Sequence, residues 1–382
     1  MNAREVTIAA ARPWFPEEDV AASAAEIAAI LRSGRLIFGP HLRALEADFA
    51  RRVGVRHAVA VSSCSAALEI AYRYVGVKGR EVIVPTNTFA ATASAAIAAG
   101  ARPVFCDMNP QDFCIDAEDA LSRITPRTAA IVVVHLAGFV APIEKLREKC
   151  AALGIALIED CAHAHGARLR GRPAGSLGLA GCFSFYSTKI LTCGVGGMLT
   201  TDDDALAAFA RSLRHHGQGD TIEEILRPGN DWVLDEVRCV IARRQLMRLD
   251  EILARRRALV TRYTTLLARD DHARIAHPAW GTEPAWYKYP IVLQEGVDRD
   301  EVRRLLRERH GIEAGALYWP PCHLMPAFSG LPGTGPGALP VSEEWLARQL
   351  TLPLHPGLAV DDATRVVTAL TELLTGAPSV VR

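Results

Sequence analysis

Short apolar runs alternate with alanine-rich stretches over residues 55–200, and this alternation constrains the fold most. Strands are indicated because these runs are brief and rich in valine and isoleucine; they cover 58–62, 81–85, 103–106, 129–135, 155–160, 182–186 and 197–201. Apolar residues at helical spacing follow several of them, at 66–75, 90–99 and 143–153. The pattern predicts an α/β domain whose mostly parallel sheet is sandwiched by helices.

The pattern changes after residue 235, where one long helical stretch runs to about 269 and a proline-containing loop follows it. A fresh strand is then indicated at 287–293, a helix at 299–310, a short strand at 314–317 and a closing helix at 361–374. We therefore expect two domains, a large one over 1–245, which includes the N-terminal segment, and a smaller α+β domain over 246–382.

Composition favours small-molecule chemistry. Acidic and basic residues balance at 43 each, which gives no electrostatic reason to expect a nucleic acid or an anionic membrane as a partner. No segment approaches the roughly 20 apolar residues of a membrane span, and the N-terminus lacks the apolar core of a secretion signal. The nine scattered cysteines include no CxxC pair. We expect a soluble cytoplasmic protein with reduced cysteines.

Two acids end the predicted strand IALIED, at Glu159 and Asp160. In open α/β sheets, ligands bind at the carboxyl ends of the strands, and strand alternation directs only one of these two side chains inward. An equally plain interpretation is that Asp160 caps a helix over 161–167. From position alone, both interpretations stay open.

Lys189 lies in CFSFYSTKILTCGVGGM, among aromatic, small and apolar residues where a free ammonium would be costly to bury. A Schiff base to an aldehyde cofactor would remove that cost, although a lysine reaching out from a surface loop fits the context as well. If 182–186 is a strand, Phe183 and Phe185 share one face. Ser184 then lies on the other face and could reach a phosphate near Lys189.

Other motifs fit poorly. The chain has no GxxxxGK[ST] loop and no GxGxxG fingerprint, and Tyr186 and Lys189 are one residue too close for a short-chain dehydrogenase pair. His163 and His165 form HAH, but no HExxH or carboxylate pair completes a ligand set. No metal site is predicted.

Together with these residues, ordered segments along nearly the whole chain resemble the DegT-type sugar aminotransferases, which have the aspartate-aminotransferase fold, or fold type I, of pyridoxal 5′-phosphate (PLP) enzymes. The matching segments are 33–40, 61–71, 81–95, 124–138, 158–167, 182–189, 213–217 and 311–323. The resemblance implies a homodimer with active sites at the subunit interface. It also implies transfer of an amino group from glutamate or glutamine, through PLP and its amine form PMP, to a keto-sugar in amino-sugar or antibiotic biosynthesis, with a nucleotide-linked sugar expected.

The resemblance also assigns roles to residues. Lys189 would carry the cofactor and move a proton, and Asp160 would pair with the pyridinium nitrogen, keeping the ring an effective electron sink. The cofactor would further be contacted by Phe89 on its ring, by Ser65 and Ser184 at its phosphate, by Cys64 in the phosphate loop, where a glycine is usual, and by His163, where many relatives have a glutamine at the ring hydroxyl.

The segment GNDWVLDE, residues 229–236, is similar to the family segment from which an asparagine reaches the phosphate in the partner subunit. Ungapped alignment puts Asp231 at that position, where its charge would oppose the phosphate, so either Asn230 takes the role or the contact is weakened. Tyr318 and His323 match a family segment near the active site and are candidate substrate contacts.

Three alternatives remain. The acceptor could be a cyclitol or aminoshikimate-type ring, because His163 is also found in such relatives. A PLP-dependent sugar dehydratase of the same fold is disfavoured, since that branch has a histidine where Lys189 stands. A ligand-binding protein that lost catalysis is supported only by the substitutions at 163, 231 and 233.

Overall fold

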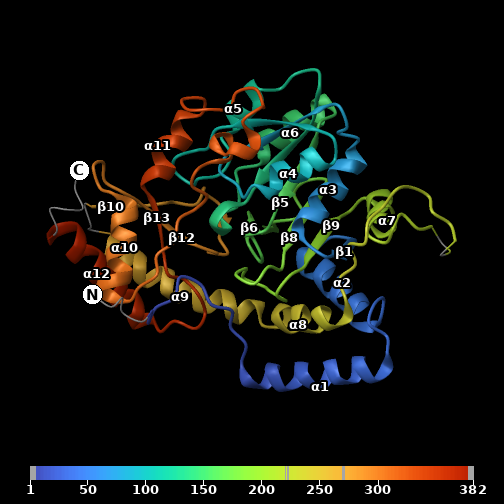
Figure 1. The fold of residues 1–382 in the computed structure, drawn as a ribbon, viewed down its shortest axis with the longest axis horizontal. Helices are drawn as coiled ribbons and strands as arrows, with labels where there is room; N and C mark the ends of the chain where they lie inside the picture. Colours follow the sequence, from blue (N-terminus) through green and yellow to red (C-terminus); the bar gives the residue numbers. More distant parts are fainter. Residues whose placement is uncertain (1–5, 220, 222, 269–271, 377–382) are drawn as a thin grey trace.

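A seven-stranded sheet forms the centre of the computed structural model, which describes residues 6–219, 221, 223–268 and 272–376 (Figure 1). The strand order is β1-β9-β8-β5-β4-β2-β3. All neighbours from β8 to β3 are parallel, and β9 runs antiparallel to both β1 and β8. The strands are β1 (His57–Val61), β2 (Glu81–Pro85), β3 (Arg102–Cys106), β4 (Thr128–Val134), β5 (Ala156–Asp160), β8 (Ala180–Ser184) and β9 (Gly197–Thr201).

The α/β prediction is confirmed, and most of these strands lie within one residue of their predicted bounds. The predicted strand 182–186 is the exception, because β8 ends at Ser184. Beyond it the chain turns: the Tyr186 amide donates to Ser184 Oγ at 3.3 Å, and the Lys189 amide donates to the Tyr186 carbonyl at 2.9 Å. The chain thus leaves the sheet just before the lysine.

Helices cover both faces of this sheet, as strand alternation requires. Val59 and Val61 face a core shared with α3 (Cys64–Val75), α4 (Ala91–Ala98) and α7 (Asp204–Leu213). Ala58 and Ala60 face the opposite core, which includes side chains of α2 (Pro40–Val53), α5 (Ala117–Ser122), α6 (Glu144–Leu153) and α8 (Glu236–Met247).

The predicted helical stretch from 235 to 269 is two helices, α8 and α9 (Leu249–Leu267), which meet at Arg248. Helix α8 packs against α2 and against α1 (Glu17–Ser33), whereas α9 packs against α12 (Val360–Gly376). Arg248 also pairs with Asp19 of α1 at 2.9 Å. Figure 1 shows α8 and α9 running along one edge of the molecule, with α1 beneath α8.

A third core cluster lies at the other end of the molecule (Figure 1). Its antiparallel sheet consists of β10 (Ala273–Ile275), β12 (Tyr289–Leu293) and β13 (Gln349–Leu352), packed with α9, α10 (Arg299–His310) and α12. The predicted strand at 314–317 is wrong: only Gly315 forms an isolated bridge, to Thr351. Ile8 of the N-terminal segment joins this cluster and bridges Ile312. The domain division at 245/246 stays a prediction.

The remaining elements are short. Helix α11 spans Pro340–Arg348, a small sheet contains β6 (Arg168–Leu169), β7 (Arg172–Pro173) and β11 (Thr282–Glu283), and three 3-10 turns occur at Leu136–Gly138, Cys322–Leu324 and Pro326–Phe328. Among the described residues, no helix has the length and apolar character that crossing a bilayer demands.

Candidate active site

One cavity of about 440 Å³ opens beside the carboxyl ends of β4, β5 and β8, where open parallel sheets bind ligands. Val134, Asp160 and Ser184, the last residues of these three strands, all line it. Eight residues predicted from the sequence meet here: Cys64, Ser65, Phe89, Asp160, His163, Ser184, Lys189 and Tyr318. They come from segments more than 200 residues apart in the chain, so the fold brings together what the sequence separates.

Asp160 is buried and faces this cavity. Its carboxylate accepts hydrogen bonds from Thr92 Oγ1 of α4 at 2.8 Å and from the Ala162 amide at 3.0 Å. Burial raises the pKa of Asp160, although the Ala162 and Thr92 hydrogen bonds and the Lys189 charge act in the opposite direction. The alternative interpretation, a helix cap, does not hold, because residues 161–167 form turns instead of a helix.

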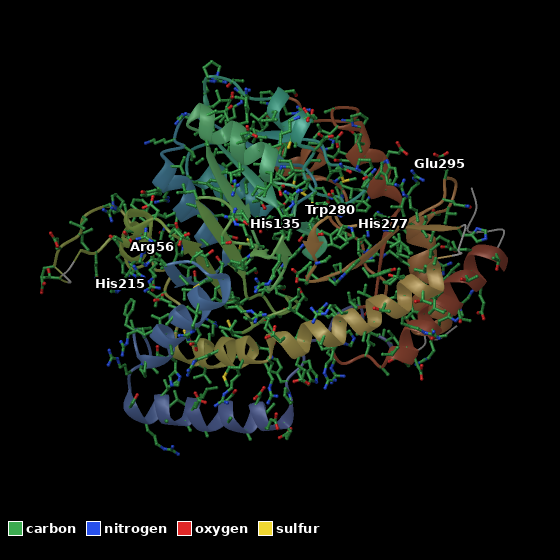
Figure 2. The ribbon with its side chains drawn as sticks, turned by 180° about the vertical axis from the view of Figure 1, so that it is seen from behind. Arg56, His135, His215, His277, Trp280 and Glu295 are labelled. Carbon is green, nitrogen blue, oxygen red and sulfur yellow. The ribbon has the colours of Figure 1, made fainter. Side chains whose placement is uncertain are left out.

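Glu159 points to the other side of β5 and is fully buried. It accepts hydrogen bonds from the amides of Gly175, Leu177 and Gly178 and lies 2.9 Å from His135 Nε2. Figure 2 shows His135 in the middle of the molecule. Although His135, Glu159 and Cys161 bring possible metal ligands within 4.8 Å of one another, Glu159 is already satisfied by these contacts. Through its hydrogen bonds to three amides of the loop after β7, Glu159 holds that loop against the sheet.

Lys189 is half-buried on the loop after β8 and lines the cavity. Its Nζ lies over the ring of Tyr287, 4.8 Å from the centroid, and the Tyr287 hydroxyl is 3.0 Å from Thr188 Oγ1. The predicted alternation around it is confirmed: Phe183 and Phe185 both pack on Phe49, while Ser184 faces the cavity. The lysine therefore points inward over an aromatic ring.

His163 is buried between two tyrosines. Its ring stacks on Tyr287 with centroids 4.2 Å apart, and its Nε2 is 2.9 Å from the Tyr318 hydroxyl. Burial, with smaller contributions from Lys189 and Lys288, lowers the pKa of His163 well below its usual value. Its Nδ1 is buried and has no hydrogen-bond partner among the described residues. The ring is thus held neutral, with one nitrogen still available to a ligand.

The start of α3 forms another wall of the cavity. Ser63 is the N-cap and accepts from the Ala66 amide at 3.1 Å, so Ser65 lies in the first helical turn with its side chain exposed to the cavity. The Cys64 thiol donates to the Cys182 carbonyl at 3.3 Å. Gly197 allows β9 to pass close to the start of α3, since a Cβ at residue 197 would lie 2.4 Å from the Ser63 carbonyl carbon. The first amides of a helix favour an anion at such a place.

Three predicted site residues do not line this cavity. His323 is buried elsewhere, between Thr86 Oγ1 at 2.8 Å and Glu343 Oε1 at 3.0 Å, where it holds the 322–324 turn. Asn230 and Asp231 lie on the chain that pairs with 213–216 beyond α7: the Asn230 amide donates to the Leu213 carbonyl, and Asp231 bridges His215. Figure 2 shows His215 on the α7 side of the molecule, away from His135.

Other lining residues were missed by sequence reasoning. Thr92 follows Phe89 by three residues, and helical phase alone could have directed it to the cavity. Tyr287 had no such signal, because it was predicted only as the first residue of a strand. Its backbone carbonyl, with those of Trp286 and Leu354, accepts from the buried guanidinium of Arg256 in α9. Tertiary packing alone places this tyrosine.

Some apolar lining residues are unusually exposed. Phe89 is 61% exposed, Tyr186 54% and Val195 46%. The part of this chain that the structure describes leaves these side chains uncovered.

Comparison with known proteins agrees with this geometry. A model of the DegT/DnrJ/EryC1/StrS aminotransferase family matches residues 17–371. A curated relative from Micromonospora megalomicea subsp. nigra, dTDP-3-amino-3,4,6-trideoxy-alpha-D-glucose transaminase, is 39% identical over 352 residues, which are 91% of this chain and 93% of the relative.

Solved structures match along the whole fold. S. venezuelae DesV, in complex with a ketimine intermediate, is 36% identical with a TM-score of 0.90, covering 96% of this chain and 99% of DesV. A Streptococcus pneumoniae chain solved in a PLP form and a PMP form is 26% identical; its PLP form has a TM-score of 0.88 and covers 97% of this chain and 100% of its own. The fold type I prediction is confirmed.

Proposed function

The chain belongs to the DegT/DnrJ/EryC1/StrS aminotransferase family, and from this premise we propose that it transfers an amino group from glutamate or glutamine to a nucleotide-linked keto-sugar. Aminotransferases of this family depend on PLP. The observation that carries the proposal is one cavity lined by both a buried carboxylate, Asp160, and a lysine, Lys189, at the carboxyl edge of the sheet.

The residues of the cavity fit PLP. The Asp160 carboxylate is buried at a cost, and a protonated ring nitrogen would compensate that cost. The unpaired Nδ1 of His163 fits a ring hydroxyl. Ser65 and the first turn of α3, with Ser184, fit the phosphate, and Phe89 is free to stack on the ring. Lys189 would hold the aldehyde carbon covalently.

When bound, PLP supplies an electron sink that stabilises negative charge at the donor α-carbon. The chain's own residues do the rest. Asp160, fixed by Thr92 and the Ala162 amide, keeps a proton on the ring nitrogen. Lys189 would move the proton from the donor α-carbon to the former aldehyde carbon of the cofactor, and in the second half-reaction it would move a proton from that carbon to the acceptor carbon. His163 stays neutral because burial disfavours its charged form, so it orients the ring without titrating.

We propose that a second copy of this chain completes the cavity. The exposed side chains of Tyr186 and Val195 at the cavity support this, since a partner surface would cover them. Asn230 or Asp231 would then serve the partner's site, which is consistent with their lying outside the cavity of their own chain.

The acceptor class is supported by the relative from Micromonospora, whose name specifies a dTDP-linked deoxysugar. A single-turnover screen tests it: the PMP form is mixed with nucleotide-linked keto-sugars, free keto-sugars and inososes, and the decay of the PMP absorbance is followed. We expect fast decay with a nucleotide-linked keto-sugar. Decay with inososes alone would instead assign the enzyme to cyclitol amination, and release of ammonia without an amino donor would assign it to sugar dehydration.

A further inference from the structure

Lys288 is a second lysine beside the catalytic one. Its Nζ lies 5.2 Å from the centroid of the Tyr287 ring, and Lys189 Nζ lies 4.8 Å from the same centroid. His163 stacks on the same ring. Both ammonium groups therefore lie close to one tyrosine ring that also contacts His163. Nothing in the proposed mechanism uses Lys288, although it is half-buried and close to the reacting lysine.

This corner of the molecule has an excess of positive charge. Within the described residues, neither Lys288 nor Lys189 forms an ion pair with a carboxylate, and Asp160 is the only acid that lines the cavity. The nearby guanidinium of Arg256 is buried and donates to backbone carbonyls instead of to an acid. Burial lowers the pKa of Lys288; Tyr287 acts in the opposite direction, and the charges of Arg256 and Lys189 lower it further. Cations gathered in this way favour a bound anion.

The chemistry of the donor identifies the anion. Lys189 must reach the α-carbon of the amino acid, and the α-carboxylate is one bond from that carbon. A carboxylate on that carbon would lie near the ring of Tyr287, which lines the cavity and has Lys288 Nζ 5.2 Å from its centroid, although Lys288 does not itself line the cavity. The cofactor phosphate does not compete for this place, because its expected contacts are at the start of α3 and at Ser184.

We propose that Lys288 binds the α-carboxylate of the amino donor, with Tyr287 holding the lysine at that position. The inference rests on the proposed function and deepens it, because glutamate and glutamine share this carboxylate and both would be recognised. A keto-sugar has no α-carboxylate, so Lys288 serves the donor half-reaction and not the acceptor half-reaction.

The two half-reactions of the holoenzyme separate this role from a structural one. In Lys288→Met, we expect kcat/KM for glutamate in the donor half-reaction to fall about 10- to 100-fold, the effect of removing one charged hydrogen bond. The acceptor half-reaction of the PMP form should stay within about twofold of wild type. Lys149→Met, on the exposed face of α6, is the matched control and should change neither.

A change in the donor gives a second measurement. Wild type should prefer glutamate to its α-carboxamide, isoglutamine, and Lys288→Met should lose most of that preference. Calorimetric titration with 2-methylglutamate, which has no α-proton to lose, should show binding weakened about 10- to 100-fold in Lys288→Met and restored in part in Lys288→Arg. These binding values do not depend on turnover.

An unchanged donor half-reaction in Lys288→Met would overturn the inference, and so would an undiminished preference of this variant for glutamate over isoglutamine. A loss confined to the acceptor half-reaction would also overturn it and would assign the lysine to the sugar's phosphates. A wild-type holoenzyme that reacts with no amino acid would instead overturn the proposed function, so the two failures are distinguishable.

Discussion

Asp160 is costly to the folded protein when no cofactor compensates it. Because burial raises its pKa in the folded state, the unfolded chain loses the proton first as pH rises. Above pH ~4, the ionised Asp160 therefore lowers the free energy of unfolding. This destabilisation stops increasing once the pH passes the pKa that Asp160 has in the folded protein. Such a residue is kept for its chemistry and not for stability.

The variant Asp160→Asn tests both the stability cost of the carboxylate and its role in turnover. In the apo-protein, the free energy of unfolding of the variant relative to wild type should rise as the pH increases above ~4, as measured by urea unfolding. In the holoenzyme, turnover should fall about 100- to 1,000-fold because the ring nitrogen loses its anionic partner. Parallel pH profiles of stability would show that the carboxylate is not penalised.

His163 gives the opposite pH dependence. Its pKa is lowered in the folded state by burial and by Lys189, so the unfolded chain takes up a proton as pH falls below ~6.5 and folding loses stability there. His163→Gln in the apo-protein should therefore lose less stability than wild type between pH 7 and pH 5, by ~1–2 kcal/mol. Urea unfolding measures this, and His277→Gln, at an exposed position (Figure 2), should behave like wild type.

At the residue scale, motifs and resemblance located eight of the residues that line the cavity, because Asp160 and Ser184 end strands whose side chains alternate and Lys189 lies on the loop after β8. His323 and Tyr287 show the limit. Whether a side chain in a loop faces a cavity or a buried hydrogen-bond partner depends on contacts with distant segments, such as Thr86 for His323 and Arg256 for Tyr287.

Helix α2 begins without a side-chain cap of its own, since Gly39 is the N-cap. Glu236, the buried first residue of α8, replaces it: its carboxylate accepts from the amides of Gly39 at 3.0 Å, His41 at 2.9 Å and Leu42 at 2.9 Å. A Cβ at residue 39 would lie 2.3 Å from the Glu236 carboxylate oxygen, which explains the glycine in SGRLIFGP. One acid thus joins two helices almost 200 residues apart.

Glu236→Gln should lower the free energy of unfolding by ~1.5–3 kcal/mol, because a neutral amide accepts these hydrogen bonds less strongly and buries an NH₂ group among donors. Glu344→Gln, at a side chain that is 57% exposed and pairs with Arg348 on α11, should cost less than ~1 kcal/mol. Chemical denaturation measures both. Equal effects would mean that Glu236 does not cap α2.

Elements of the central sheet were predictable because each strand is a short, mostly buried apolar run. Strand β13 was not, since its four residues follow α11 directly and are too few to show alternation. The break between α8 and α9 also escaped prediction, because no proline or glycine marks Arg248 and the interruption reflects two different packing partners.

At the scale of the molecule, the described residues form three hydrophobic clusters, two on the faces of the central sheet and one toward the C-terminal end (Figure 1). Sequence patterns predicted a domain boundary at 245/246, and this boundary stays a prediction. They could not indicate that Ile8 crosses to the C-terminal cluster, because one apolar residue in a short segment has no period to read.

A functional dimer is tested by complementation between two inactive variants. Lys189→Ala disables its own subunit's site, and a double variant, Asn230→Ala with Asp231→Ala, would disable the partner's site. Unfolding and refolding an equal mixture should restore about a quarter of wild-type activity, because half of the dimers are mixed and one of their two sites is intact. No recovery, with dimers confirmed by light scattering, would mean that 230–231 do not serve the partner's site.

The central claim is that Lys189 carries the cofactor in a cavity completed by Asp160. The most direct test is borohydride reduction of the PLP-loaded protein, followed by digestion and mass spectrometry of the peptides. The reduced cofactor is expected on the peptide that contains Lys189 and on no other. Label on the peptide that contains Lys288, or a protein that binds PLP and yields no labelled peptide, would contradict it.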